Sequence, residues 1–154
     1  SRYIIQNKPD YYRLLQAVRD REAWEEWILF MLDGVAATSR QTIALIVRIR
    51  DMMLDYKHRI REQFPKLYSQ DLLNNLFRHP YTKIAILQQD LSVSRLTATR
   101  YLDQLAAAGY LEKRRYGRFN YYINTPLVNL FLNLPRAPRL PAELQIESAR
   151  NPAP

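Results

Sequence analysis

Hydrophobic residues recur at helical spacing along most of the chain, and proline, glycine and capping residues divide this pattern into segments. Apolar side chains three and four positions apart predict helices over about 9–20, 22–32, 39–63, 70–77 and 84–91. We expect the second of these helices to end near Gly34 and the third, which is the longest, to end before Pro65. The pattern therefore predicts a mainly α-helical protein.

The clearest part of the pattern is the stretch from Ile84 to Ile123. Ser94 suits the N-cap of a further helix, and this helix carries a buried stripe of Ala98, Tyr101, Leu102 and Leu105 and ends near Gly109. Strand-like runs over 111–115 and 119–123 flank a turn at 116–118, and residues 81–83 predict a short strand that pairs with this hairpin. A last short helix follows residue 124. Helix, short turn, helix and basic hairpin is an order that resembles a winged helix-turn-helix.

The second helix of this stretch and the hairpin are rich in positive charge. Six positive and two negative residues lie between Ser94 and Arg118, which gives a net charge of 6 − 2 = +4. A helix about 10–12 Å across fits the DNA major groove, which is about 12 Å wide, while the hairpin can contact phosphates. The candidate DNA-binding residues are Ser94, Arg95, Thr97, Thr99, Arg100, Arg114, Arg115 and Arg118.

An alternative reading is a winged helix that serves protein contact or forms a homodimer, with its charges on an ordinary solvated face. The alternative stays open because a fold does not fix a function. DNA binding requires Arg95 and Arg100 to share one face of the molecule with the hairpin arginines.

Composition narrows the class of protein. The chain has 154 residues and a net charge of +8, which favours an acidic partner such as nucleic acid. It has no cysteine, so disulfides, zinc-finger ligands and thiol nucleophiles are excluded. Its first residues, SRYIIQNK, lack the apolar region of a signal peptide, and no apolar run is long enough to span a membrane, so we expect a cytoplasmic location and no membrane partner.

No set of catalytic or metal-binding residues is evident in the sequence. The two histidines, His58 and His79, lie in settings typical of a charged helix surface and a helix end. Glu22, Glu25 and Glu26 suit the first turn of a helix better than they suit an acid–base pair. Trp24 and Trp27 are three positions apart, and we expect both to pack in a core.

The first part of the chain resembles the last helices of the Fic domain. The resemblance rests on SRYIIQNKPDYYRLLQAVR followed by the W-x-x-W-I-x-F-M-L-x-G-V pattern of Trp24 to Val35. Together with the long helix and the winged helix-turn-helix, it is similar to the C-terminal part of bacterial Fic-family proteins, from about Ser1 to Leu134. Members of that family transfer AMP from ATP, with Mg²⁺, to a hydroxyl group of a target protein.

The resemblance also implies what this chain lacks. The family's catalytic motif, H-x-F-x-[DE]-G-N-G-R-x-x-R, does not occur in the sequence, and by family order it would lie upstream of Ser1. Tyr11 corresponds to a tyrosine that lies against adenine, and Arg19 to a polar residue that contacts the base, where asparagine is the familiar choice. We therefore expect a C-terminal fragment with no catalytic residue, no metal and no cofactor of its own.

The predicted organisation has three parts. Residues 1–64 would hold the Fic-like helices and the long helix, and residues 65–134 the winged helix-turn-helix. Residues 135–154 contain five prolines and predict a flexible tail. The expected partners are DNA, the target protein of the parent enzyme, or a second copy of the chain.

Overall fold

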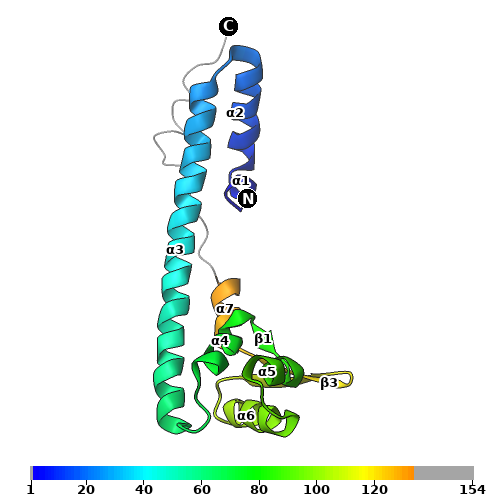
Figure 1. Ribbon diagram of the computed structural model, residues 1–154. Coiled ribbons are helices and arrows are strands. Elements are labelled where there is room, and N and C mark those ends of the chain that lie inside the picture. Colours follow the sequence, from blue (N-terminus) through cyan, green and yellow to red (C-terminus); the bar gives the residue numbers. More distant parts are fainter. Residues whose placement is uncertain (1, 134–154) are drawn as a thin grey trace. The chain divides into compact units, whose positions relative to one another are not determined.

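The computed structural model describes residues 2–133, which form two compact units that meet within one helix, at Ala44 and Leu45. We call residues 2–44 the amino-terminal unit and residues 45–133 the carboxy-terminal unit. The prediction of a mainly α-helical protein with a small hairpin is confirmed, whereas the predicted tail lies outside the described residues (Figure 1). The elements are α1 (Arg2–Gln6), α2 (Lys8–Arg21), α3 (Trp24–Gln63), α4 (Gln70–Arg78), β1 (Tyr81–Thr82), α5 (Ile84–Leu91), α6 (Arg95–Ala107), β2 (Glu112–Tyr116), β3 (Phe119–Ile123) and α7 (Thr125–Leu132).

The helix α3 corrects two predictions. The sequence pattern gave two helices with a break near Gly34, but α3 is continuous from Trp24 to Gln63. Gly34 instead provides space for a neighbouring ring, because a Cβ at this position would lie 2.8 Å from Cδ1 of Tyr3. A helix tolerates an interior glycine at a modest cost, so here the glycine reflects close packing rather than a helix end.

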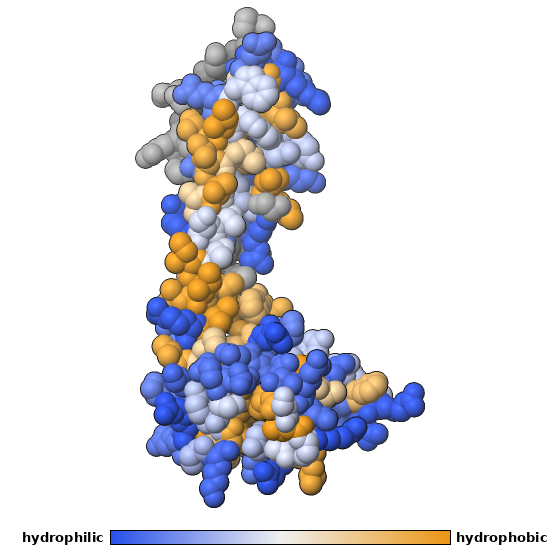
Figure 2. Space-filling model, viewed as in Figure 1, coloured by the Kyte–Doolittle hydropathy of each residue, from blue (hydrophilic) through white to orange (hydrophobic). Residues whose placement is uncertain are grey.

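The amino-terminal unit has a small core. Tyr3, Leu14, Phe30 and Ala37 are buried, and Tyr11 and Trp27 pack against this cluster. The expectation that Trp24 packs in a core is wrong, since its side chain is 57% exposed. Figure 2 shows further hydrophobic side chains exposed along this part of α3, and they include Ile28, Leu29, Leu32, Val35 and Ile43.

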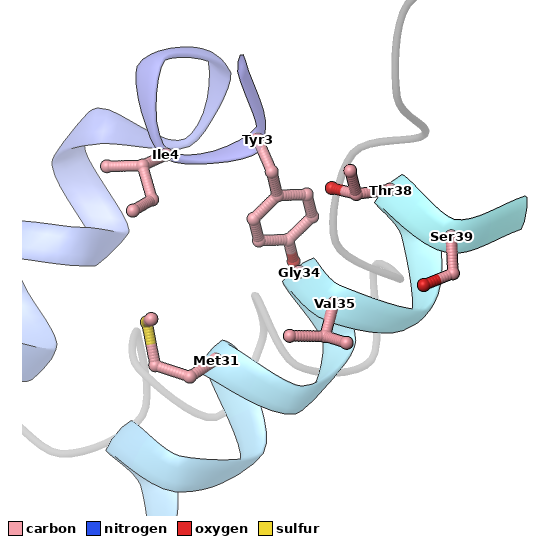
Figure 3. A pocket seen from close by; sticks show the side chains of 7 residues that line it. All are labelled: Tyr3, Ile4, Met31, Gly34, Val35, Thr38 and Ser39. Carbon is pink, nitrogen blue, oxygen red and sulfur yellow. The ribbon is translucent and has the colours of Figure 1, made fainter. Parts of the chain in front are cut away.

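A pocket of about 310 Å³ lies beside the contact between Tyr3 and Gly34 (Figure 3). Its lining comes from α1 and α3 and consists of Tyr3, Ile4, Met31, Gly34, Val35, Thr38 and Ser39. The ring of Tyr3 points toward Gly34, while Met31 and Ile4 border the same space. The lining is mainly apolar and contains no ionisable side chain other than the phenol of Tyr3.

The carboxy-terminal unit has a larger core, to which every helix from α3 to α6 contributes. Its fully buried residues include Leu72, Leu76, Leu87, Leu102, Leu105 and Tyr122. Ser69 accepts a hydrogen bond from the backbone N–H of Leu72 at 3.0 Å, so α4 begins with a side-chain cap. Gly109 has a φ of 80°, which confirms the predicted end of α6.

The last turns of α3 belong to this second core. Tyr56 and Ile60 are buried in it, so the compact unit begins at Leu45, before the predicted domain boundary at residues 64–65. The hydroxyl of Tyr56 donates to the backbone carbonyl of Tyr110 at 3.0 Å and lies 3.4 Å from Oδ1 of Asn124. Burial raises the pKa of Tyr56 to about 12, so this phenol is a neutral donor.

Three antiparallel strands form a sheet in the order β1-β3-β2. The predicted pairing of residues 81–83 with the hairpin is confirmed, because Tyr81 pairs with Ile123 and Thr82 with Tyr122. Gly117 has a φ of 59° at the first position of a two-residue turn, which is where type II′ turns favour glycine. Asn124 follows the sheet and caps α7 by accepting from the N–H of Leu127 at 3.1 Å.

Candidate nucleic-acid interface

The start of α6 is organised by local hydrogen bonds. The hydroxyl of Ser94 accepts from the backbone N–H of Thr97 at 3.1 Å, and the two hydroxyl oxygens lie 3.0 Å apart. The hydroxyl of Thr99 donates to the backbone carbonyl of Arg95 at 2.8 Å. All three predicted hydroxyl residues therefore have local partners. Because Ser94 and Thr97 share one hydroxyl hydrogen bond, one of these two hydroxyl groups can still donate to a ligand.

Two arginines and one leucine of α6 are exposed to solvent. Leu96 is 81% exposed, and Arg95 and Arg100 are exposed on either side of it in sequence. The guanidinium of Arg100 lies 5.7 Å from the ring centre of Tyr101, which keeps it close to the helix surface. In the described part of the chain, neither arginine takes part in an ion pair.

The hairpin holds four of the six positive side chains, and two of them are paired. Nζ of Lys113 lies 2.7 Å from Oδ1 of Asp103, and Nε of Arg114 lies 2.7 Å from Oε1 of Glu112. The other two are Arg115 and Arg118, of which Arg115 donates to the backbone carbonyl of Gly117 at 3.2 Å. Among residues 2–133, these two arginines form no ion pair.

The strand register separates the predicted hairpin residues onto two faces. Successive side chains of a strand point to opposite sides, so Arg114 and Arg115 lie on different faces. Lys113 reaches Asp103 of α6, which identifies the face of Lys113 and Arg115 as the one that α6 occupies. We call this the α6-facing side of the hairpin. Arg114 pairs with Tyr121 across the strands on the opposite, outer face.

The carboxylate of Asp103 joins α6 to both strands of the hairpin. Its Oδ1 atom accepts from Nζ of Lys113 at 2.7 Å and from the hydroxyl of Tyr122 at 2.7 Å. Partial burial acts to raise the pKa of Asp103, but the hydrogen bonds from Lys113 and Tyr122 outweigh it and hold the pKa below its ordinary value. The hydrogen bond to Asp103 also raises the pKa of Lys113, so both groups are charged at neutral pH.

The outer face of the sheet carries aromatic side chains that the sequence reasoning did not single out. Tyr81, Tyr116 and Phe119 are exposed, and the ring of Tyr121 lies 5.6 Å from those of Tyr81 and Tyr116. Nζ of Lys83 lies 4.4 Å from the ring centre of Tyr121. Alternation of aromatic residues along 119–123 was the available signal, whereas no local pattern predicts the position of Lys83.

The two residues assigned by resemblance lie in the amino-terminal unit. The ring of Tyr11 packs against Trp27 at 5.1 Å between centres and meets Tyr12 edge to face at 5.4 Å. Arg19 is exposed two turns later on α2. The structure thus places Tyr11 within a small aromatic cluster, and the role of either residue beside a nucleotide stays a prediction.

Residues 2–133 contain no group of three or more His, Cys, Asp or Glu side chains that could hold a metal ion. Within the same residues, no helix is both long enough and apolar enough to cross a membrane.

These observations define a helical module with a basic helix and hairpin, in which the last turns of a long helix complete the core. Residues 52–127 match the family model described as the C-terminal domain of SoFic-like protein adenylyltransferases. The match runs from the second half of α3 into α7 and so covers most of the carboxy-terminal unit. This match confirms the resemblance of these residues to the C-terminal part of a Fic-family protein.

Proposed function

We propose that the carboxy-terminal unit is a winged helix-turn-helix that binds duplex DNA through α6 and the α6-facing side of the hairpin. One observation carries the proposal. The segment has a charge of +4, and once Lys113 and Arg114 are paired with acids, this charge resides on Arg95, Arg100, Arg115 and Arg118. Figure 2 shows hydrophilic side chains extending along the hairpin at the right of the view. Phosphates are the partners that most simply satisfy such a set.

The surface of α6 suits entry into the major groove. Arg95 and Arg100 are long donors that can reach base edges or phosphates, and arginine commonly reads guanine by a bidentate contact. Leu96 offers an apolar contact of the kind that the thymine methyl group receives. Thr97 and Thr99 are short and half-buried, so the helix can approach the groove closely.

The test is fluorescence anisotropy with a random duplex and with the parent gene's own promoter, over a series of salt concentrations. Binding should weaken steeply with salt, because each neutralised phosphate contributes about 0.9 to the log–log slope. Arg118→Ala should lower this slope by about one for all sequences, and Arg95→Ala should change sequence preference by about 1–3 kcal/mol.

Arg114→Ala is the matched control, because it removes the same charge from the outer face of the same hairpin. We expect it to change the slope much less than Arg118→Ala does. A protein that binds neither duplex more tightly than about 10⁻⁴ M, the weak edge of non-specific binding, would rule the proposal out.

AMP transfer is proposed here only for a longer protein that contains the Fic motif. The 154 residues lack the histidine that would act as a base and the glycine-rich turn that would hold phosphates. We expect this chain to transfer no AMP to proteins of a cell lysate supplied with labelled ATP and Mg²⁺. Labelling above that of a sample without the chain would contradict this expectation.

The aromatic outer face favours a second candidate function, which is protein contact or dimerisation. Exposed tyrosine and phenylalanine side chains are enriched at the centres of protein interfaces. Phe119 is 61% exposed and Tyr116 is 56% exposed on this face. Sedimentation of the chain and of Phe119→Ser would test dimerisation. If this face holds a dimer, the unaltered chain should remain dimeric at concentrations at which Phe119→Ser is monomeric.

A further inference from the structure

The position of Asp103 is unexpected for a helix that faces DNA. A carboxylate near phosphates is repelled by them, so an acid on α6 should weaken binding. Asp103 nevertheless lies on this helix, and its side chain is 42% exposed. Its Oδ1 atom accepts two hydrogen bonds of 2.7 Å, from Lys113 of β2 and from Tyr122 of β3.

We propose that Asp103 is a positioning residue that fixes the hairpin against α6, so that Arg115 and Arg118 meet the same duplex as Arg95 and Arg100. The proposal rests on the DNA-binding function proposed above. Lys113 and Tyr122 are directly opposite each other in the β2–β3 ladder, so Asp103 holds a single rung of the sheet.

That rung is a fixed point from which the hairpin extends. Tyr116, at the end of β2, lies three residues beyond Lys113, or about 10 Å at about 3.3 Å per residue. A small rotation about the rung would therefore displace the arginines at the tip by a large part of the spacing between phosphates. Fixing the rung keeps the tip in register with the helix.

The ion pair between Asp103 and Lys113 would not by itself fix the rung, because exposed ion pairs contribute little to stability. The additional bond from Tyr122 is different in kind. Tyr122 is 0% exposed, so its hydroxyl needs an acceptor within the protein, and Asp103 is the acceptor that it has. The buried Tyr122 thus anchors the carboxylate of Asp103 from inside the core, while the same carboxylate holds Lys113 on the surface.

The experiment asks whether Asp103→Ala strengthens or weakens duplex binding. Electrostatics alone predicts that Asp103→Ala binds a random duplex more tightly, since a negative charge is lost. Our proposal predicts weaker binding, by about tenfold, which corresponds to about 1.4 kcal/mol. Asp51→Ala is the matched control, because Asp51 also forms an ion pair, with Arg50 at 2.9 Å, but on the exposed surface of α3.

A double-mutant cycle separates positioning from a loss of stability. In the Asp103→Ala background, Arg118→Ala should have less effect on binding and on the salt slope than it has in the unaltered chain. Tyr122→Phe removes only the anchoring hydroxyl and leaves all charges in place, and it should weaken binding in the same direction. Asp103→Ala binding as tightly as Asp51→Ala, or an unchanged effect of Arg118→Ala, would overturn the proposal.

A measurement without DNA keeps the two proposals distinguishable. The chain has no cysteine, so Gln104→Cys on α6 and Tyr116→Cys on the hairpin can carry two spin labels specifically. The distance distribution between them should broaden in Tyr122→Phe and in Asp103→Ala. An unchanged distribution would refute the positioning role, whereas the absence of duplex binding by the unaltered chain would refute the DNA-binding function alone.

Discussion

The two units of the chain bury their hydrophobic side chains to different extents. In the carboxy-terminal unit, the apolar stripes of α4, α5 and α6 meet one another and the last turns of α3, and leucines such as Leu72, Leu87 and Leu102 are completely buried. In the amino-terminal unit, α3 also carries an apolar stripe, but residues such as Trp24 and Val35 remain exposed. The difference teaches that helical periodicity predicts which face is apolar and leaves open whether another element covers it.

The largest expected effect tests this contrast directly. Leu102→Ala should destabilise the carboxy-terminal unit by about 2–5 kcal/mol, because it leaves a cavity in a fully buried position. Trp24→Ala should change stability by no more than about 0.5 kcal/mol, as surface substitutions do. Urea denaturation followed by circular dichroism would measure both. Similar losses for the two variants would mean that Trp24 is covered in solution.

A second effect concerns the close packing within the amino-terminal unit. Gly34→Ala would place a Cβ 2.8 Å from the ring of Tyr3, so we expect a loss of about 1–3 kcal/mol from overpacking. In a Tyr3→Ala background, the same change should instead stabilise the helix by about 0.5–1 kcal/mol, the usual preference for alanine over glycine. Thermal denaturation of the four proteins of this cycle would show the change of sign. If Gly34→Ala raised the stability in both backgrounds, the close contact between Gly34 and the ring of Tyr3 would be refuted.

A third effect tests where the carboxy-terminal unit begins. Tyr56→Phe removes the donor to the carbonyl of Tyr110 and should cost about 1–2 kcal/mol, because a buried acceptor is left unsatisfied. The loss should appear as faster amide hydrogen exchange in α4 to α6 and should leave α2 unchanged. Equal loss of protection in α2 would indicate that the two units unfold together.

The smallest expected effect is the pH dependence that Asp103 confers. In the folded chain, the pKa of Asp103 is below its ordinary value. Ionised Asp103 therefore contributes its full stabilisation of the fold above the unfolded pKa of about 3.9, and this stabilisation is lost as the pH falls through the folded pKa. Between pH 5 and 8, the stability difference between the chain and Asp103→Asn should be constant and at most about 1 kcal/mol. Below about pH 4, it should shrink. A difference that grows on acidification would refute this assignment.

Much of the carboxy-terminal unit could be predicted because its signals are local. Ser94 caps a helix where the sequence indicated, and Gly109 and Gly117 adopt the positive φ angles that helix ends and tight turns require. The pairing of Asp103 with Lys113 and Tyr122 could not be predicted, since it joins residues 10 and 19 positions apart. The exposure of Trp24 could not be predicted either, because a local sequence pattern does not show whether another element covers a side chain.

The candidate DNA-binding residues could be predicted by type but not by side. Arginine and threonine at the start of α6 were recognisable from residue chemistry, and the exposure of Arg95 and Arg100 agrees with the requirement that they reach a ligand. Whether Arg114 or Arg115 shares the side of α6 depends on the partner of Lys113, which is a tertiary contact. Strand alternation places the two arginines on opposite faces, which the sequence analysis did not take into account, and the ion pair of Lys113 shows which one faces α6.

The two-residue turn at Gly117 restricts which insertions and deletions this hairpin can accept during evolution. Side chains alternate along each strand, so whether Lys113 and Arg115 face α6 while Tyr116 and Tyr121 face outward depends on whether residue counts are odd or even. Inserting one residue into β2 before Lys113 and shifting the pairing by one would exchange the two sides along the entire strand. Inserting two residues would restore them. Length variation in this hairpin should therefore survive in steps of two, and a single-residue change should be accompanied by a bulge that cancels it.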